Sequence, residues 1–410
     1  MNVSEQMTVI GSAARNAADV LRSAPAEQRS AAISAMARHV RRRSAEILEA
    51  NAADVAEATS MIDRLMLNPE RVEGIATALE EIAILPDPVG KVIDRWTRPN
   101  GLEISRVRTP IGVIGMIFES RPNVTADAAA ICLRSGNAVI LRSGSEALRS
   151  ALAIGRAIAD ALSEAGLPAG SVQVVPTADR EAVGMMLEGL GGAIDLIIPR
   201  GGRGLVERVT TQARVPVLGH LEGVCHTYVH ESADPKMAVE IVRNAKMRRV
   251  TVCGATETLL IDKAAAPELL PQIAAALQDC ELRGDEQARA IVPMKTATEA
   301  DWHTEYLAPI LAVKTVENVD DAVTHIRRFG TGHTEAIVAE ESAAAEYFLD
   351  KVDSAIVLWN ASTQYADGGE FGFGAEIGIA TGKLHARGPV GPEQLTTFKY
   401  QVRGNGQTRP

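Results

Sequence analysis

Short apolar segments alternate with longer helical segments through most of this chain of 410 residues. A strand followed by a helix and then by another strand predicts a parallel sheet with right-handed crossovers. The expected strands of a first series are 111–118, 138–142, 172–175 and 194–198, and the helices after them are 124–135, 145–165, 179–190 and 203–213. The pattern therefore predicts an α/β lobe built on a parallel sheet.

A second series of the same kind follows Val224. Its expected strands lie near 226–230, 256–261, 291–294, 310–316, 336–339 and 355–359, with helices near 234–246, 264–280, 318–329 and 341–350. The chain is thus expected to form two α/β lobes. Because ligands of such sheets bind at the carboxyl ends of strands, we expect the functional residues there.

The segments outside these series also have interpretable patterns. Residues 4–60 and 60–85 place apolar side chains at helical spacing, and 93–109 alternates polar and apolar residues as an exposed or hairpin strand does. The stretch 366–394 is rich in glycine and is expected to form long ordered loops.

Composition excludes several function classes. The net charge of −10 argues against a nucleic-acid partner, and 46% hydrophobic with 23% charged residues argues against disorder. The four cysteines form no CxxC pair, so we expect no disulfide framework and no metal site. The first twenty residues lack the pattern of a secretory signal, and 111–118 is too short to span a bilayer. We therefore expect a cytoplasmic protein with no membrane partner.

Two turns after expected strands could hold a phosphate group. IDLIIPRGGRGL (194–205) is a strand followed by Gly201-Gly202 and a helix start, where backbone N–H groups favour an anion. VILRSGSEA (139–147) ends a strand with Arg142-Ser143-Gly144-Ser145 before a helix. Helix capping explains the second turn equally well on spacing alone.

Cys253 is the strongest candidate for a nucleophile. It precedes Gly254 and an expected strand, and it follows Lys246, Arg248 and Arg249. Nearby cations in a turn lower a thiol pKa, although an inert buried cysteine is the commoner case.

Cys225 begins a strand in which His226, Tyr228 and His230 share one face by the period of two. This pattern leaves open a histidine–cysteine metal site, but a half-exposed strand is the better interpretation.

Two further segments offer groups for an anionic substrate. ESRPNVTAD (119–127) places Arg121 and Asn123 after a strand, and KLHARGPVG (383–391) places His385 and Arg387 between glycine-rich turns. Arginine binds carboxylate or phosphate through two parallel hydrogen bonds.

Read together, these segments resemble the gamma-glutamyl phosphate reductase family, a branch of the aldehyde dehydrogenase superfamily. The resemblance covers nearly the whole chain. Its most specific parts are ESRPNVTAD, IPRGGRGL (198–205), GHTEAIV (332–338), NAST with DGGEFG (360–372), GAEIGIATGKLHARGPVG (374–391) and LTTFKY (395–400). Cys253 falls at the position of the family's catalytic cysteine, although Val250-Thr251-Val252 replaces the family's usual residues before it.

The resemblance implies reduction of L-glutamyl 5-phosphate by NADPH to L-glutamate 5-semialdehyde, the second step of proline synthesis. It implies Cys253 as the nucleophile and Asn123 as an oxyanion donor, with Arg121, His385 and Arg387 as candidates for binding the charged groups of the substrate. The cofactor-binding residues that it implies are Arg142, Ser143, Ser145, Pro199, Gly201, Gly202 and Glu305.

The same resemblance implies an aldehyde dehydrogenase-like α/β fold with two Rossmann-like lobes and an architecture of four parts. Residues 1–97 and 110–225 would form the cofactor-binding domain, and 226–365 the catalytic domain with Cys253. Residues 98–109 and 389–404 would form a small β arm for oligomerisation, and 366–388 the active-site loops. We therefore expect a homodimer or a higher assembly, and functional coupling to glutamate 5-kinase.

Two other functions remain open on the sequence. A hydrolytic aldehyde dehydrogenase would use NAD(P) and a carboxylate base to activate water, and Glu222 lies near where that base is found. A scaffold or regulatory subunit without activity is the third possibility, against which the intact Cys253 and the cofactor turns argue.

Overall fold

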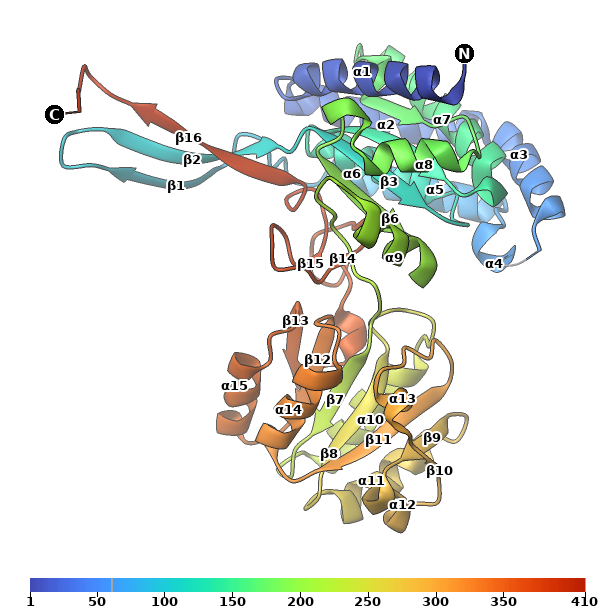
Figure 1. Ribbon diagram of the computed structural model, residues 1–410, viewed down its shortest axis with the longest axis vertical. Helices are drawn as coiled ribbons and strands as arrows, with labels where there is room; N and C mark the ends of the chain where they lie inside the picture. The colour runs from blue at the N-terminus through green and yellow to red at the C-terminus, as the bar shows by residue number, and fades with distance from the viewer. Residues whose placement is uncertain (60–61, 410) are drawn as a thin grey trace. The chain divides into compact units, whose positions relative to one another are not determined.

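A computed structural model describes residues 1–59 and 62–409 of the chain (Figure 1). The chain divides into two compact units. Unit 1 comprises Met1–Gly219, Gly372–Gly378 and Val390–Pro410, and unit 2 comprises His220–Phe371 and Ile379–Pro389. Residues 60 and 61, at the junction of two expected helical segments, lie outside the described residues.

Unit 1 is built on a parallel sheet with the strand order β5-β4-β3-β6. All residues of β3 and β4 are buried, so both faces of these central strands are covered. The chain adds β4 and β5 on one side of β3 and returns to add β6 on the other, which creates the strand-order reversal where nucleotides bind. The strands are β3 (Val113–Phe118), β4 (Ala138–Ser143), β5 (Val172–Val174) and β6 (Leu196–Arg200).

Capping residues start several helices of unit 1. The side chain of Asn2 accepts a hydrogen bond from the Glu5 N–H, and Asn68 caps the helix that begins with Pro69. The helices are α1 (Val3–Leu21), α2 (Ala26–Arg42), α3 (Ser44–Glu57), α4 (Ile62–Leu65), α5 (Pro69–Ala83), α6 (Val124–Arg134), α7 (Leu148–Glu164), α8 (Arg180–Leu187) and α9 (Arg203–Gln212). The 3₁₀ turns are η1 (Ser145–Ala147), η2 (Ala169–Ser171) and η3 (Leu190–Gly192).

A three-stranded antiparallel arm extends from the same unit, as Figure 1 shows. It contains β1 (Val92–Thr97), β2 (Glu103–Pro110) and β16 (Thr396–Arg403), in the order β1-β2-β16. The expected arm strand 98–109 is in fact a turn and β2, and β1 lies before it, inside the range assigned to the cofactor domain. Phe398, Tyr400 and Val402 are exposed on β16.

Unit 2 holds a second parallel sheet with the strand order β10-β9-β11-β8-β7-β12-β13. Every residue of β7 is buried, so the expectation of a half-exposed strand there is wrong. The strand lies between two neighbours and is covered on both faces. The strands are β7 (Cys225–Val229), β8 (Thr256–Asp262), β9 (Glu281–Gly284), β10 (Lys295–Thr296), β11 (Ile310–Val316), β12 (Thr334–Val338) and β13 (Ile356–Trp359).

The expected strand at 291–294 is also wrong. Ile291 ends a helix, and Val292 and Met294 pack against the core without pairing in the sheet. The sheet instead uses β9, whose residues Glu281 to Arg283 are only half-buried and show no apolar run.

Helices α10 to α15 pack around this sheet, and one pair of short strands lies in the glycine-rich segment. The helices are α10 (Pro235–Met247), α11 (Ala266–Ala276), α12 (Glu286–Ile291), α13 (Glu299–Trp302), α14 (Val319–Phe329) and α15 (Ser342–Lys351), with the 3₁₀ turn η4 (Thr363–Tyr365). The pair is β14 (Ile379–Ala380) with β15 (Gly388–Pro389). Among the described residues, no helix combines the length and the apolar character needed to cross a membrane.

Candidate active site

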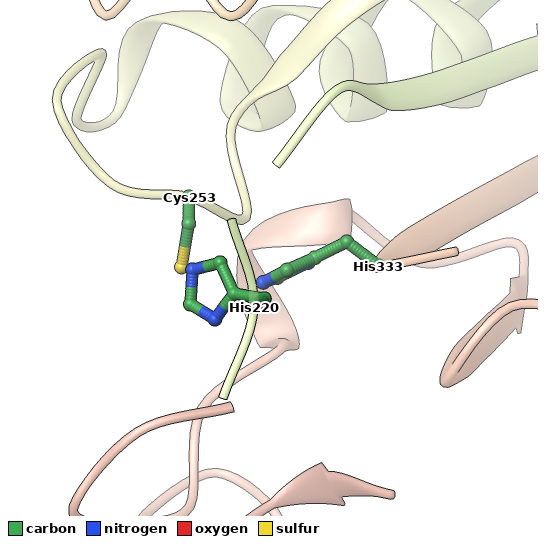
Figure 2. A group of neighbouring side chains, drawn as sticks. All are labelled: His220, Cys253 and His333. Carbon is green, nitrogen blue, oxygen red and sulfur yellow. The ribbon is translucent and has the colours of Figure 1, made fainter. Parts of the chain in front are cut away.

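Cys253 lies beside two histidines that come from distant parts of the sequence. His220 precedes β7, Cys253 precedes β8 and His333 precedes β12, and these strands are neighbours in the order β8-β7-β12. Because the strands are parallel, their amino ends meet at one edge of the sheet and bring the three side chains together (Figure 2). The expectation that the functional residues of this lobe lie at the carboxyl ends of its strands is therefore wrong for Cys253.

The His220 ring is oriented by a backbone carbonyl. Its Nδ1 lies 2.7 Å from the carbonyl oxygen of Ile379, which can only accept, so Nδ1 carries the proton. Nε2 is then the nitrogen able to accept a proton, and Figure 2 shows a ring nitrogen of His220 beside the sulfur of Cys253. One ligand atom each from His220, Cys253 and His333 lie within 4.8 Å of one another.

His333 is completely buried behind His220. The two rings meet edge to face with 4.8 Å between their centroids. Nδ1 of His333 lies 2.9 Å from the Thr334 hydroxyl and 3.6 Å from the sulfur of Cys225. Its Nε2 is buried and has no hydrogen-bond partner in the described part of the chain.

The backbone of the Cys253 turn is packed against Gly223. A Cβ atom on Gly223 would lie 2.1 Å from the carbonyl oxygen of Cys253, so only glycine fits at that position. The Cys225 thiol donates to the same carbonyl across 3.1 Å. These contacts hold the Cys253 turn against the amino end of β7.

A buried ion pair joins the two ends of the loop that carries Cys253. Nζ of Lys246 on α10 lies 2.5 Å from Oε2 of Glu257 on β8, and both side chains are fully buried. Burial raises the pKa of Glu257 to about 7, an effect that the Lys246 ammonium group opposes. The side-chain amide of Gln364 donates to the carbonyl oxygen of Ala245 at 2.9 Å and so secures the same end of α10.

Cys253 differs from the other three cysteines in its exposure to solvent. Cys253 is only partly buried, whereas Cys132, Cys225 and Cys280 are buried. Burial raises the pKa of the Cys280 thiol to about 11 and the pKa values of Cys132 and Cys225 further still. Among the four, Cys253 is therefore the thiol placed to react.

The alternative metal site on β7 does not form among the described residues, because its members have other partners. His226 Nδ1 lies 2.9 Å from Oε2 of Glu335, and the Tyr228 hydroxyl donates to Asp262 across 2.7 Å. Nδ1 of His230 lies 2.9 Å from the Ser232 hydroxyl. The group next to Cys253 was missed because local spacing cannot show histidines that only the sheet order brings together.

Glu305 lies close to this group within unit 2. The backbone N–H of Gly223 donates to its carboxylate, and burial raises its pKa. Since Gly223 also lies against the Cys253 carbonyl, Glu305 borders the turn that carries Cys253.

In unit 1, the glycine turn after β6 lies beside a carboxylate. The Gly202 N–H donates to Oε2 of Glu119 across 2.8 Å, and a Cβ on Gly201 would lie 2.5 Å from the same oxygen. The turn follows the buried Pro199 and leads into α9. The start of α9 thus already binds one anionic group, as a phosphate-binding helix terminus would.

Buried polar atoms without partners mark the end of β4. Nη2 of Arg142 donates to the carbonyl of Ala178 at 2.9 Å, while Arg142 Nε and Ser143 Oγ have no partner in the described part of the chain. Burial lowers the pKa of Arg142, an effect that Glu146 and Asp179 oppose and that Arg208 and Arg180 strengthen. Ser145 is exposed at the start of η1, and the residue that caps this turn, Gly144, forms no side-chain hydrogen bond.

The candidate anion-binding residues lie in both units. In unit 1, Arg121 precedes α6, and Nδ2 of Asn123 donates to Asp127 across 2.8 Å. In unit 2, Arg387 forms hydrogen bonds of 2.7 Å to the side chain and the carbonyl oxygen of Asp353, while His385 is exposed in a left-handed conformation with φ +66°.

Comparison with known proteins agrees with this arrangement. Residues 3–302 match the model of the aldehyde dehydrogenase family. A gamma-glutamyl phosphate reductase of Caulobacter sp. (strain K31) is 63% identical over 100% of both chains, and one of Caulobacter vibrioides is 64% identical over 98% of this chain and 100% of its own. The chain belongs to the aldehyde dehydrogenase family, in its gamma-glutamyl phosphate reductase branch.

Solved structures of this family show the same fold. The crystal structure of gamma-glutamyl phosphate reductase from Thermotoga maritima matches with a TM-score of 0.96 at 46% identity, over 99% of this chain and 100% of that one. An acetylating aldehyde dehydrogenase from Geobacillus thermoglucosidasius shares the fold alone, with a TM-score of 0.70 at 18% identity over 100% of this chain and 98% of that one. The predicted aldehyde dehydrogenase-like α/β fold and the family resemblance are thus confirmed.

The buried ion pair predicts a large and pH-dependent stability loss in Lys246→Ala. The variant leaves Glu257 buried without its cation, which costs about 3–5 kcal/mol of unfolding free energy near pH 8. A carboxyl whose pKa is raised on folding binds more protons folded than unfolded, so its contribution to stability falls as pH rises. The loss should therefore be smaller at pH 5, as urea denaturation at the two pH values measures.

The matched control is Lys263→Ala, because Lys263 pairs with Glu317 on the surface with 57% and 60% of the two side chains exposed. That variant should lose less than about 1 kcal/mol. Similar losses in the two variants, independent of pH, would contradict the role assigned to the buried pair.

Proposed function

We propose that this chain reduces L-glutamyl 5-phosphate to L-glutamate 5-semialdehyde and phosphate, with NADPH as the reductant. The observation that carries the proposal is the partly buried thiol of Cys253, held on a fixed turn beside His220, in a chain whose relatives over its full length are gamma-glutamyl phosphate reductases. The reaction is the second step of proline synthesis from glutamate.

The chemistry assigned to Cys253 is nucleophilic catalysis. Nε2 of His220 takes the thiol proton, and the thiolate attacks the acyl carbon and expels phosphate, which is a good leaving group. NADPH supplies the hydride that reduces the thioacyl group. The resulting thiohemiacetal on Cys253 then collapses, which releases the aldehyde and regenerates the thiol.

Unit 1 is the proposed cofactor-binding domain, and unit 2 carries the nucleophile. The reversal of strand order beside β3, the turn at Gly201 and Gly202 that already binds the Glu119 carboxylate, and the partnerless atoms of Arg142 and Ser143 fit a dinucleotide. Pro199 and Ser145 border the same strand ends. Glu305 is assigned to the nicotinamide ribose, since it borders the turn that carries Cys253.

The remaining assignments concern the substrate and the assembly. Arg121, His385 and Arg387 are proposed to bind the charged groups of the substrate, and Asn123 to donate to the oxyanion. Arg387 and Asn123 would have to exchange their present partners, Asp353 and Asp127, for the substrate. The exposed apolar residues of the β arm support a homodimer or a higher assembly. The proposed location is the cytoplasm. Coupling to glutamate 5-kinase there would shorten the path of a reactive acyl phosphate.

Cys253→Ala should abolish reductase turnover, because no other group is placed to carry the acyl chain. Folding and NADPH binding should persist, as circular dichroism and cofactor fluorescence titration measure. The matched control is Cys280→Ala in the same unit, which should cost stability at most. A Cys253→Ala variant that keeps most of its rate would rule out the covalent route.

Arg142→Ala should weaken NADPH more than NADH, by about 1–3 kcal/mol for the loss of a charge-assisted contact to the 2′-phosphate. Arg142 has the cations Arg208 and Arg180 and the carboxylates Glu146 and Asp179 as charged neighbours, and its buried Nε has no partner in the described part of the chain. Dissociation constants for both cofactors test this, with the exposed Arg156→Ala as the control. Equal losses for the two cofactors would show that Arg142 has a structural role only.

The hydrolytic alternative requires a carboxylate base next to the thioester. The group that Cys253 forms with His220 and His333 contains no carboxylate among the described residues, and Arg121 and Arg387 offer anion-binding groups for phosphate. Oxidation of the semialdehyde with NADP should therefore require phosphate, or arsenate in its place, and Glu222→Gln should leave the reduction nearly unchanged. Rapid oxidation in phosphate-free buffer that disappears in Glu222→Gln would establish the hydrolytic reaction instead.

A further inference from the structure

His220, Cys253 and His333 form a set of metal ligands at the amino ends of β7, β8 and β12. Two imidazole nitrogens and one thiolate are the ligand types that zinc prefers, and a set of three leaves a fourth position for water. The set differs from a carboxylate cluster, because carboxylates gather on protein surfaces without any metal.

The hydrogen bonds behind the two histidines are those of metal-binding imidazoles. A ligating histidine normally engages its second nitrogen with a carbonyl or another polar group, which orients the ring. Nδ1 of His220 does so with the Ile379 carbonyl at 2.7 Å, and Nδ1 of His333 lies 2.9 Å from the Thr334 hydroxyl.

The remaining nitrogen of His333 gives an independent reason for a ligand. Nε2 is buried and finds no hydrogen-bond partner in the described chain, a costly arrangement for a polar atom. Figure 2 shows a ring nitrogen at the far end of His333 directed toward His220 and Cys253. A cation bonded to this nitrogen would satisfy it.

The distances suit closure around an ion. The three ligand atoms lie within 4.8 Å of one another, and tetrahedral zinc with bonds of about 2.0–2.3 Å holds its ligands about 3.5 Å apart. Changes in the side-chain torsions of the partly buried His220 and Cys253 that move their ligand atoms by about 1 Å would complete the site. His333, next to the rigid start of β12, would stay in place.

We propose that Zn²⁺ binds reversibly to His220, Cys253 and His333 and thereby blocks the nucleophile. A zinc–sulfur bond replaces the S–H bond of Cys253, and the thiol proton passes to the buffer. No oxidation or reduction accompanies this step. The bound thiolate can no longer attack an acyl phosphate, so the site couples the activity of the chain to the availability of free zinc.

Isothermal titration of the metal-free full-length chain with ZnCl₂ tests binding without any turnover, so its outcome is independent of the reaction assigned above. We expect one zinc per chain with micromolar affinity or tighter. Cys253→Ser, His220→Asn and His333→Asn should each weaken binding at least about 10-fold, since even changes behind the ligands cost 10–100-fold in metal affinity. Cys280→Ser and His303→Asn, which change the same residue types elsewhere in unit 2, should bind as the unaltered chain does.

Cobalt gives a second measurement on the unaltered chain, which covers the case in which a variant fails to fold. Co²⁺ bound to the three residues should show an intense sulfur-to-cobalt charge-transfer band, and alkylation of Cys253 beforehand, verified by peptide mass spectrometry, should abolish it. Zinc should in turn protect Cys253 from iodoacetamide and inhibit the reductase, and EDTA should reverse both effects.

Several results would overturn the proposal. They are the absence of stoichiometric zinc binding, equal affinity in the three ligand variants and in the unaltered chain, or a comparable loss in the Cys280→Ser and His303→Asn controls. A cobalt complex without a thiolate band would also exclude Cys253 as a ligand.

Discussion

The position of Cys253 depends on an ion pair that contains no catalytic atom. Lys246 and Glu257 meet inside unit 2 at the two ends of the loop that carries the thiol, and neither side chain reaches solvent. Removing two charges from water is expensive, and only mutual attraction and further hydrogen bonds make the arrangement tolerable. Because the loss of either partner leaves the other charge buried and unpaired, the pair holds the two ends of the loop together.

The sheet supplies the rest of the site through its strand order. Parallel strands place all their amino ends on one edge, so residues before β7, β8 and β12 converge although they are far apart in the chain. Gly223 allows the Cys253 carbonyl to approach the end of β7, and Ile379 sets the proton on Nδ1 of His220. Each of these contacts uses backbone atoms, so the chemistry rests on the fold itself more than on long, mobile side chains.

Much of the fold could be predicted from the sequence because the apolar runs are continuous. Strand 310–316 was predicted with the bounds that β11 has, since most of its residues are buried and apolar and so leave a clear signal. Strand β9 was missed because its polar residues lie toward the edge of the sheet, and 291–294 was mistaken for a strand because its apolar residues pack on the core without pairing.

Less of the candidate site could be predicted. Cys253 was identified by its cationic neighbours and by resemblance, but His220 and His333 give no local signal. Their role follows from tertiary structure, and the general preference for carboxyl ends of strands directed attention to the wrong edge of the second sheet. The reversal of strand order in unit 1, by contrast, agrees with the glycine turn that the sequence indicates.

The central claim is that Cys253 carries the acyl group, and the acyl-enzyme can be measured directly. The full chain is incubated with L-glutamate 5-semialdehyde and NADP in phosphate-free buffer, quenched in acid and analysed by intact and peptide mass spectrometry. The account predicts one glutamyl group per chain on the peptide that contains Cys253, and its loss when phosphate is added before the quench. An unmodified Cys253 under these conditions, or a glutamyl group on another residue, would contradict it.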